Sequence, residues 1–234
     1  MENFFNYDSK LIQFLMKLAD MIIMNMLFIL FCIPIVTIGA AQSGLCAGIR
    51  QMMNKDDDNS AVKAFFKGFT NGFGKITLVH IGFLLIMLLF VYMLYGSLLY
   101  AGGAFTLPAI MCIIVLVICA LFHAMLAPFH THFDCTPWQL TKNMYFVVFA
   151  YFLRAVPVAA LVWLPIGVAL IDFYIFMQAF PVWAFIYYSV AYLFVYSLMK
   201  KPFADLKKEF LDSQKQATLP ENEQAAEIAE EIEA

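Results

Sequence analysis

Charged residues are scarce in this 234-residue sequence, and their scarcity excludes several classes of protein. Asp, Glu, Lys and Arg make up 13% of the chain, against about 25% in an average soluble domain. Apolar residues make up 63%, more than a soluble fold of this size can bury. The formal net charge of −3 does not fit a basic protein that binds nucleic acid. The composition therefore indicates an integral membrane protein with no nucleic-acid partner.

Paired cysteines and catalytic motifs are also missing. The five cysteines lie far apart without a Cys-x-x-Cys pair, and their odd number argues against a complete set of disulfides. We interpret them as small buried apolar residues. The sequence has no Walker phosphate loop, no Gly-x-Ser-x-Gly motif and no His-Glu-x-x-His motif. We therefore predict that the protein is not an enzyme and holds no metal and no cofactor.

Long apolar segments are what the sequence does contain. A bilayer core of about 30 Å takes about 20 residues of α-helix, and the spans must be helical because lipid offers the backbone no hydrogen-bond partners. Five segments approach this length: 18–38, 76–99, 105–129, 155–171 and 181–199. The predicted fold class is an all-α, polytopic membrane helix bundle of about five hydrophobic segments, in which the short connection 100–104 makes an antiparallel hairpin.

The basic residues indicate how the bundle is oriented. Connections 100–104 and 172–180 contain no Lys or Arg. Eleven of the 14 basic residues lie in the other connections or after the last segment: Arg50, Lys55, Lys63, Lys67, Lys75, Lys142, Lys200, Lys201, Lys207, Lys208 and Lys215. The positive-inside rule therefore predicts that these connections and the C-terminus lie in the cytoplasm and that the two uncharged connections lie outside.

The first segment has the features of a broken helix. Pro34 disfavours helical geometry in the residue before it, and Gly39 permits unusual backbone angles. Thr37 is placed to bond freed backbone groups, and a second short helix over about 40–53 follows. A re-entrant segment keeps the N-terminal lysines in the cytoplasm, whereas a full span puts them outside. The sequence leaves both alternatives open.

Residues 60–75 predict an amphipathic helix at the cytoplasmic membrane surface. Aromatic residues recur every four positions at Phe65, Phe69 and Phe73, and lysines recur on another side at Lys63, Lys67 and Lys75. This pattern suits aromatics that face lipid headgroups and lysines that bind anionic lipid. We expect Ser60 and the acidic residues 56–58 to stabilise its N-terminus.

A second helix start is predicted at Thr136, with Pro137 in the first helical position and Gln139 in the third. An unbroken helix from Pro137 to Ile171 would be about 52 Å long, which exceeds the membrane. The first part must therefore lie outside the bilayer core or at its interface, and Pro157 offers a kink.

The histidines permit two interpretations. His123, His130, His132, Asp134 and Cys135 cluster in sequence near the end of the third segment, and these side chains can bind a transition metal. The favoured alternative is a polar turn at the membrane interface without metal. His80 is interpreted as an interfacial hydrogen-bond donor, with a proton relay as the alternative.

An acidic tail ends the chain. Seven of the 17 acidic residues and one of the 14 basic residues follow Leu211, so a basic membrane part, residues 1–211, precedes an acidic segment, residues 212–234. The tail has no aromatic residue and contains Pro220. We predict a mostly disordered cytoplasmic segment.

Segment 24–39, MNMLFILFCIPIVTIG, resembles the N-terminal signature of the YesL-like membrane proteins, a bacterial domain-of-unknown-function family. Segments 65–69 and 140–143 are also similar, and the resemblance covers roughly residues 4–211. The signature residues associated with the break in the first segment are Asn25, Pro34, Thr37 and Gly39. One departure is Ala40, which stands where the family often has Pro. The resemblance implies a bacterial membrane protein often encoded near carbohydrate-uptake and polysaccharide-degradation systems, with no established reaction.

Three hypotheses about function follow. The first is a non-enzymatic accessory or assembly partner of a carbohydrate-uptake system, with the lipid bilayer and carbohydrate transporter subunits as partners. The second is a small transporter or channel subunit with its site at the broken first segment. The third, which we disfavour, is a membrane enzyme that uses His130, His132 and Asp134. The sequence leaves the oligomeric state open.

Overall fold

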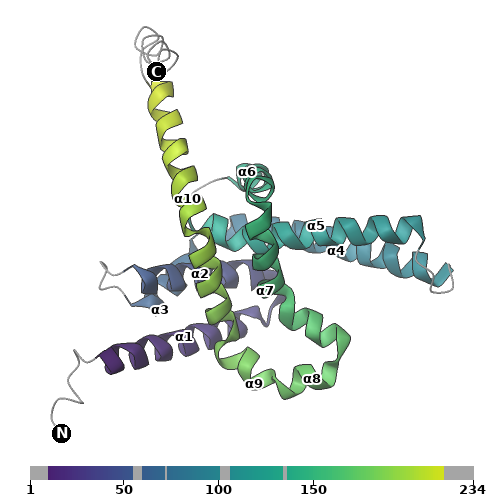
Figure 1. The fold of residues 1–234 in the computed structure, drawn as a ribbon, viewed down its shortest axis with the longest axis horizontal. Coiled ribbons are helices and arrows are strands. Elements are labelled where there is room, and N and C mark those ends of the chain that lie inside the picture. The colour runs from purple at the N-terminus through teal and green to yellow at the C-terminus, as the bar shows by residue number, and fades with distance from the viewer. Residues whose placement is uncertain (1–9, 55–59, 72, 101–105, 134–135, 219–234) are drawn as a thin grey trace. The chain divides into compact units, whose positions relative to one another are not determined.

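A computed structural model of the chain describes residues 10–54, 60–71, 73–100, 106–133 and 136–218. These residues are mainly helical, with no β-strand among them (Figure 1). Five of the helices are long and apolar enough to cross a membrane: Leu11–Cys32, Phe73–Tyr100, Leu107–His130, Phe152–Ile171 and Phe180–Lys208. The predicted all-α class is confirmed, and the chain is a multi-pass membrane protein whose surroundings are a lipid bilayer.

The first apolar segment is broken where the sequence predicts. Helix α1 (Lys10–Cys32) ends before Pro34, a short 3-10 turn η2 (Ile35–Thr37) follows, and α2 (Ile38–Met53) begins. Pro34 has extended backbone angles, φ −76° and ψ 118°, as expected for a residue that lacks an N–H and cannot continue the helix. The short helix predicted over about 40–53 is therefore confirmed as α2, which is buried over most of its length.

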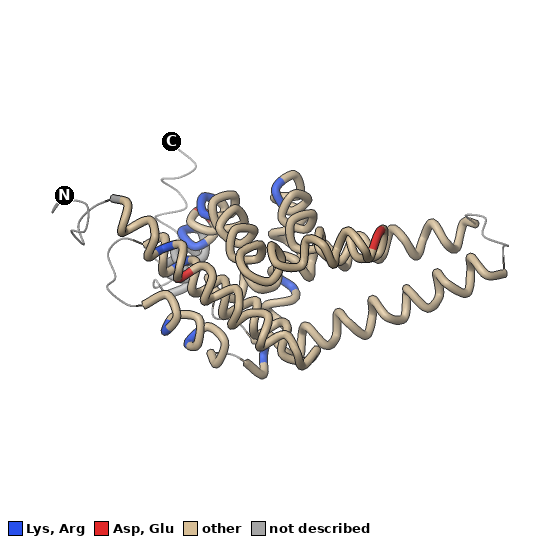
Figure 2. The backbone as a smooth tube through the Cα atoms, turned by 90° about the horizontal axis from the view of Figure 1, so that it is seen from below, with Lys and Arg blue, Asp and Glu red and all other residues tan. Residues whose placement is uncertain are grey.

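Helix α3 (Ala61–Thr70) packs along α2, and α4 (Phe73–Tyr100) and α5 (Leu107–His130) form the predicted antiparallel hairpin (Figure 1). A hydrogen bond of 2.9 Å between the Ser97 and Thr106 hydroxyls joins the helices where they meet their connection. Residues 76–133 contain no Asp, Glu, Lys or Arg, and in Figure 2 the outer halves of the two long arms of the hairpin are tan. This region is the part of the chain best suited to lipid.

The long helix predicted from Pro137 is divided in two. Helix α6 (Pro137–Ala150) begins with the expected capping box, in which Thr136 and Gln139 bond each other's backbone N–H groups. It ends at Tyr151, whose φ of −116° and ψ of 37° are not helical, and α7 (Phe152–Ile171) follows. The break lies six residues before Pro157, and α7 is continuous through that proline.

The chain divides into two compact units, residues 1–197 and 198–234. In the first unit, α7 is followed by α8 (Phe173–Gln178), α9 (Phe180–Val182), the π-helical turn η3 (Trp183–Tyr187) and the start of α10 (Tyr188–Thr218). Asp172 caps α8 by accepting hydrogen bonds from two backbone N–H groups. In the second unit, α10 continues to Thr218, past the predicted boundary at residue 211, and residues 219–234 lie outside the described part.

Candidate functional site

The Thr37 hydroxyl bonds two carbonyl groups at the turn between α1 and α2. Thr37 Oγ1 donates to the carbonyl oxygens of Phe31 at 2.5 Å and of Pro34 at 2.8 Å. A break in a helix frees carbonyl groups that would be costly to leave unpaired in a membrane. The expectation that Thr37 bonds these groups is confirmed. Its hydroxyl hydrogen is already used within the turn.

Gly39 brings the turn into direct contact with α4. A Cβ atom on Gly39 would lie 2.8 Å from Cβ of His80 and 3.0 Å from its Cγ. Only glycine permits such a close approach without a shift of one helix. The break is therefore packed against the second turn of α4, and the Ile35 backbone also lies close to the His80 ring.

His80 forms a buried pair with His123 of α5. Nδ1 of His80 lies 2.8 Å from Nε2 of His123, and the two side chains are 1% and 4% exposed. The Trp163 ring of α7 lies against His123, with 5.2 Å between ring centroids. Burial corrects the interpretation of His80 as an interfacial donor.

The histidine pair has unused hydrogen-bonding capacity. Nε2 of His80 and Nδ1 of His123 have no partner in hydrogen-bond geometry among the described residues, although the Ile35 backbone lies close to the His80 ring. A neutral imidazole carries one N–H donor and one acceptor nitrogen. Whichever ring donates within the pair, one donor nitrogen and one acceptor nitrogen stay without a partner among the described residues.

The other candidate metal ligands are engaged separately. His130 Nδ1 lies 3.0 Å from the Ser43 hydroxyl of α2, and His132 Nδ1 lies 2.8 Å from the Pro128 carbonyl oxygen. Asp134 and Cys135 lie outside the described residues. Within the described part of the chain, no three His, Cys, Asp or Glu side chains come together as a metal site.

Two polar contacts fasten α2 to the end of α5. Besides the contact between Ser43 and His130, the Arg50 guanidinium donates to the Thr131 carbonyl. On the same helix, burial raises the pKa of the Cys46 thiol well above its ordinary value, although Arg50 opposes the shift. This thiol stays protonated at neutral pH, as expected for a structural cysteine.

Asn25 belongs to the same family signature as Pro34, Thr37 and Gly39, but its side chain makes its hydrogen bonds elsewhere. Its side-chain amide donates to the carbonyl oxygens of Trp183 at 3.1 Å and Ala184 at 2.6 Å, and its Oδ1 accepts from the Ser189 N–H at 3.0 Å. A π-helical turn disturbs the ordinary backbone pairing of the helix, and an Asn side chain offers both donors and an acceptor. Asn25 therefore fastens α1 to η3, and the Ser189 hydroxyl adds a bond to the Met21 carbonyl.

The prediction that Phe65 faces lipid headgroups is wrong, because Phe65 is 0% exposed. Helix α3 lies so close to α2 that a Cβ on Gly44 would come within 2.9 Å of the Phe65 carbonyl oxygen. Gly44 and Gly48 form a Gly-x-x-x-Gly pattern, the small-residue spacing that allows membrane helices to pack closely. This glycine spacing is the feature of the sequence that indicates a close helix contact at α2.

The remaining residues of the predicted surface helix divide into two groups. The Phe69 ring packs on Phe31 of α1, with 4.6 Å between centroids, and on Phe73, with 5.4 Å. Phe73 itself is 37% exposed. The lysines Lys63, Lys67 and Lys75 are all exposed. Most of the aromatic face thus packs within the protein, while the lysines remain available for contacts outside it.

Comparison with known proteins finds one similarity. The model of a family described as "Protein of unknown function, DUF624" matches residues 21–94, which contain Asn25, the broken turn, α2, α3 and most of α4. No curated protein and no solved structure matches the chain. The matched region holds His80, whereas its partner His123 lies beyond it. The chain is thus similar, over about a third of its length, to a family whose function is unknown.

Proposed function

We propose that the chain is a non-enzymatic membrane protein that serves as an accessory or assembly partner of a carbohydrate-uptake system. The observation that carries the proposal is the use of the signature polar residues: Asn25 bonds three backbone groups of η3 and α10, and Thr37 bonds two carbonyls of its own turn. Side chains committed in this way maintain an architecture. The resemblance to the YesL-like bacterial proteins supplies the link to carbohydrate uptake.

A partner helix has a suitable surface on α4. Exposed side chains recur at alternating spacings of three and four residues, a pattern that suits packing against another long helix. They are Leu85, Leu88, Tyr92, Tyr95 and Leu99, each more than 60% exposed. In the proposed assembly, a transporter subunit packs against this stripe.

Site-specific photocrosslinking in the native membrane tests the assembly. A benzophenone amino acid replaces the exposed Leu88 in one variant and the half-buried Leu94 in a matched control. The proposal expects Leu88 to crosslink to an identified carbohydrate-transporter subunit while Leu94 does not. Purification of the chain alone after mild detergent extraction, together with normal glycan uptake in a deletion strain, would contradict it.

The proposed location is the bacterial cytoplasmic membrane, with the C-terminus in the cytoplasm. The placement of the lysines supports this orientation. For the N-terminus, an Asn3→Cys variant without native cysteines is labelled on intact cells with a membrane-impermeant thiol reagent. Labelling indicates a full first span, and protection until the cells are opened indicates a re-entrant segment.

A small transporter or channel is the second candidate. It is favoured by the buried His80–His123 pair, which lies against Gly39 of the broken turn and has two nitrogens without a hydrogen-bond partner in the described residues. Ionisable side chains inside a membrane are commonly functional. Solute flux into proteoliposomes containing this chain alone supports this candidate if Thr37→Val and His123→Asn both reduce it. Absence of flux over a panel of sugars contradicts it.

A further inference from the structure

Helix α6 has two apolar faces: one packs within the protein, and the other is mostly exposed, with only the Phe149 ring near another ring, 6.1 Å from that of Phe122. Leu140, Met144, Val147 and Val148 are all less than 5% exposed and lie on one side. Trp138, Phe146 and Phe149 are 79%, 71% and 69% exposed. With 3.6 residues per turn, these three aromatics lie on the side opposite the buried residues. The aromatic face of α6 (Trp138, Phe146 and Phe149) therefore needs a partner outside the described fold.

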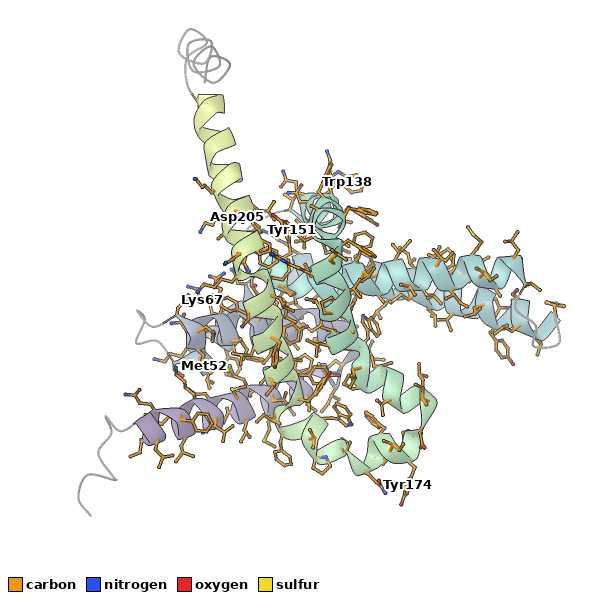
Figure 3. All side chains as sticks on the ribbon, in the orientation of Figure 1. Met52, Lys67, Trp138, Tyr151, Tyr174 and Asp205 are labelled. Atoms are coloured by element: carbon orange, nitrogen blue, oxygen red, sulfur yellow. The ribbon has the colours of Figure 1, made fainter. Side chains whose placement is uncertain are left out.

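The length and position of α6 limit what that partner can be. Its 14 residues are fewer than the roughly 20 needed to cross a bilayer. It is joined at Tyr151, without a loop, to α7, which is long and apolar enough to span. Trp138 and Tyr151, labelled in Figure 3, mark the two ends of this short helix. The end of α6 must therefore lie where α7 enters the membrane.

The exposed surface continues from α6 onto the span itself. Phe152 and Leu153, the first residues of α7, are 49% and 87% exposed. A water-facing surface of this kind would be costly, since each aromatic side chain buries about 150–250 Å² when covered. Continuity with the exposed start of α7, a helix long and apolar enough to span, favours lipid as the cover of the α6 aromatics.

The residue types on this face suit the headgroup layer. Tryptophan is enriched where the hydrocarbon meets the headgroups, because its ring is apolar and its N–H is polar. Lys142 lies on the same side and is exposed, and its flexible chain can reach lipid phosphates while its methylene groups stay in apolar surroundings. Arg154 lies over the Tyr151 ring, 5.8 Å from its centroid, just beyond the helix.

We propose that α6 lies in the lipid headgroup layer, with Trp138, Phe146 and Phe149 in the upper hydrocarbon region and Lys142 at the phosphates of anionic lipids. In this arrangement α6 anchors the start of α7 at the membrane surface. Here α6 carries the lipid-facing aromatics that the sequence suggests for α3, whose lysines Lys63, Lys67 and Lys75 stay exposed. The proposal is independent of any transporter partner.

Depth-dependent fluorescence quenching tests the position of Trp138. The chain has three tryptophans, so the double variant W163F/W183F leaves Trp138 as the only one. The protein is placed in vesicles of phosphatidylcholine and phosphatidylglycerol that carry spin labels near the headgroup or near the bilayer midplane. We expect quenching about twofold stronger from the shallow label than from the deep one, as for an interfacial tryptophan. The matched control is W138F/W183F, in which Trp163 in the α7 span should be quenched more by the deep label.

Two results would overturn the proposal. Stronger quenching of Trp138 by the deep label would place α6 within the bilayer core. Quenching by no lipid label would mean that water or another protein covers this face. If the double variant does not fold, the difference in quenching between the unmodified chain and W138F reports Trp138 alone. A Lys142→Glu variant should weaken shallow quenching in vesicles with phosphatidylglycerol and leave it unchanged in pure phosphatidylcholine, and equal effects in both would refute the lysine's role.

Discussion

Helices α3 and α6 carry similar patterns and lie in different surroundings. Both are too short to span a bilayer, and both place aromatic residues about one helical turn apart beside a spanning helix. Phe65 on α3 is fully buried, whereas Phe146 on α6 is 71% exposed. The difference comes from the neighbours: α2 offers α3 a surface of glycines, while α6 packs through its opposite face. Periodicity defines a face of a helix, and the surrounding residues decide what covers it.

Alanine substitution of Phe65 and of Phe146 should show the largest difference between α3 and α6. Phe65→Ala removes a fully buried ring and leaves a cavity, so we expect a loss of about 3–5 kcal/mol in the free energy of unfolding. Phe146→Ala in detergent should change it by less than about 0.5 kcal/mol, as for a surface residue. Denaturation in mixed micelles measures both. Equal losses would show that the two faces have the same surroundings.

Substitution of a glycine on α2 should have the next largest effect on stability. In Gly44→Val, the new Cβ would meet the Phe65 backbone carbonyl oxygen at 2.9 Å, and the backbone cannot move without displacing α3. Overpacking of this kind costs about 1–3 kcal/mol. Gly82→Val on α4 is the matched control, because nothing lies within 4 Å of a Cβ there. Equal thermal midpoints for the two variants would contradict close packing of α3 on Gly44.

Substitution of the residues that precede α6 and α3 should have the smallest effect on stability. The Thr136 side chain accepts a hydrogen bond from the Gln139 N–H, whereas Ser60 at the start of α3 makes no such bond. Thr136→Ala should therefore destabilise the protein by about 1 kcal/mol, and Ser60→Ala should have little effect. Differential scanning fluorimetry on the purified variants is sufficient. A larger loss for Ser60→Ala would reverse the assignment of which helix is capped.

Local features could be predicted from the sequence. The end of α1 follows from Pro34, which has no N–H and restricts the residue before it. The start of α6 follows from Thr136, Pro137 and Gln139, whose bonds span only three residues. The five spans follow from length and hydropathy, because a bilayer imposes both. Each of these signals acts over a short stretch of chain.

Non-local contacts could not be predicted in the same way. His80 and His123 are 43 residues apart, and nothing near either one identifies the other. Asn25 meets Trp183 and Ser189 only after α1 and η3 have packed together. For the contact between α2 and α3 the sequence holds a partial signal, because Gly44 and Gly48 have the spacing of closely packed membrane helices. That spacing indicates close packing without naming the helix that packs there.

Lipid photolabelling tests the central comparison most directly. The protein is placed in bilayers containing a phospholipid with a diazirine group high on its acyl chain, irradiated, and analysed by peptide mass spectrometry. We expect lipid adducts on Trp138, Phe146 and Phe149 of α6 and none on Phe65 of α3. Adducts on Phe65 together with an unlabelled α6 would contradict it.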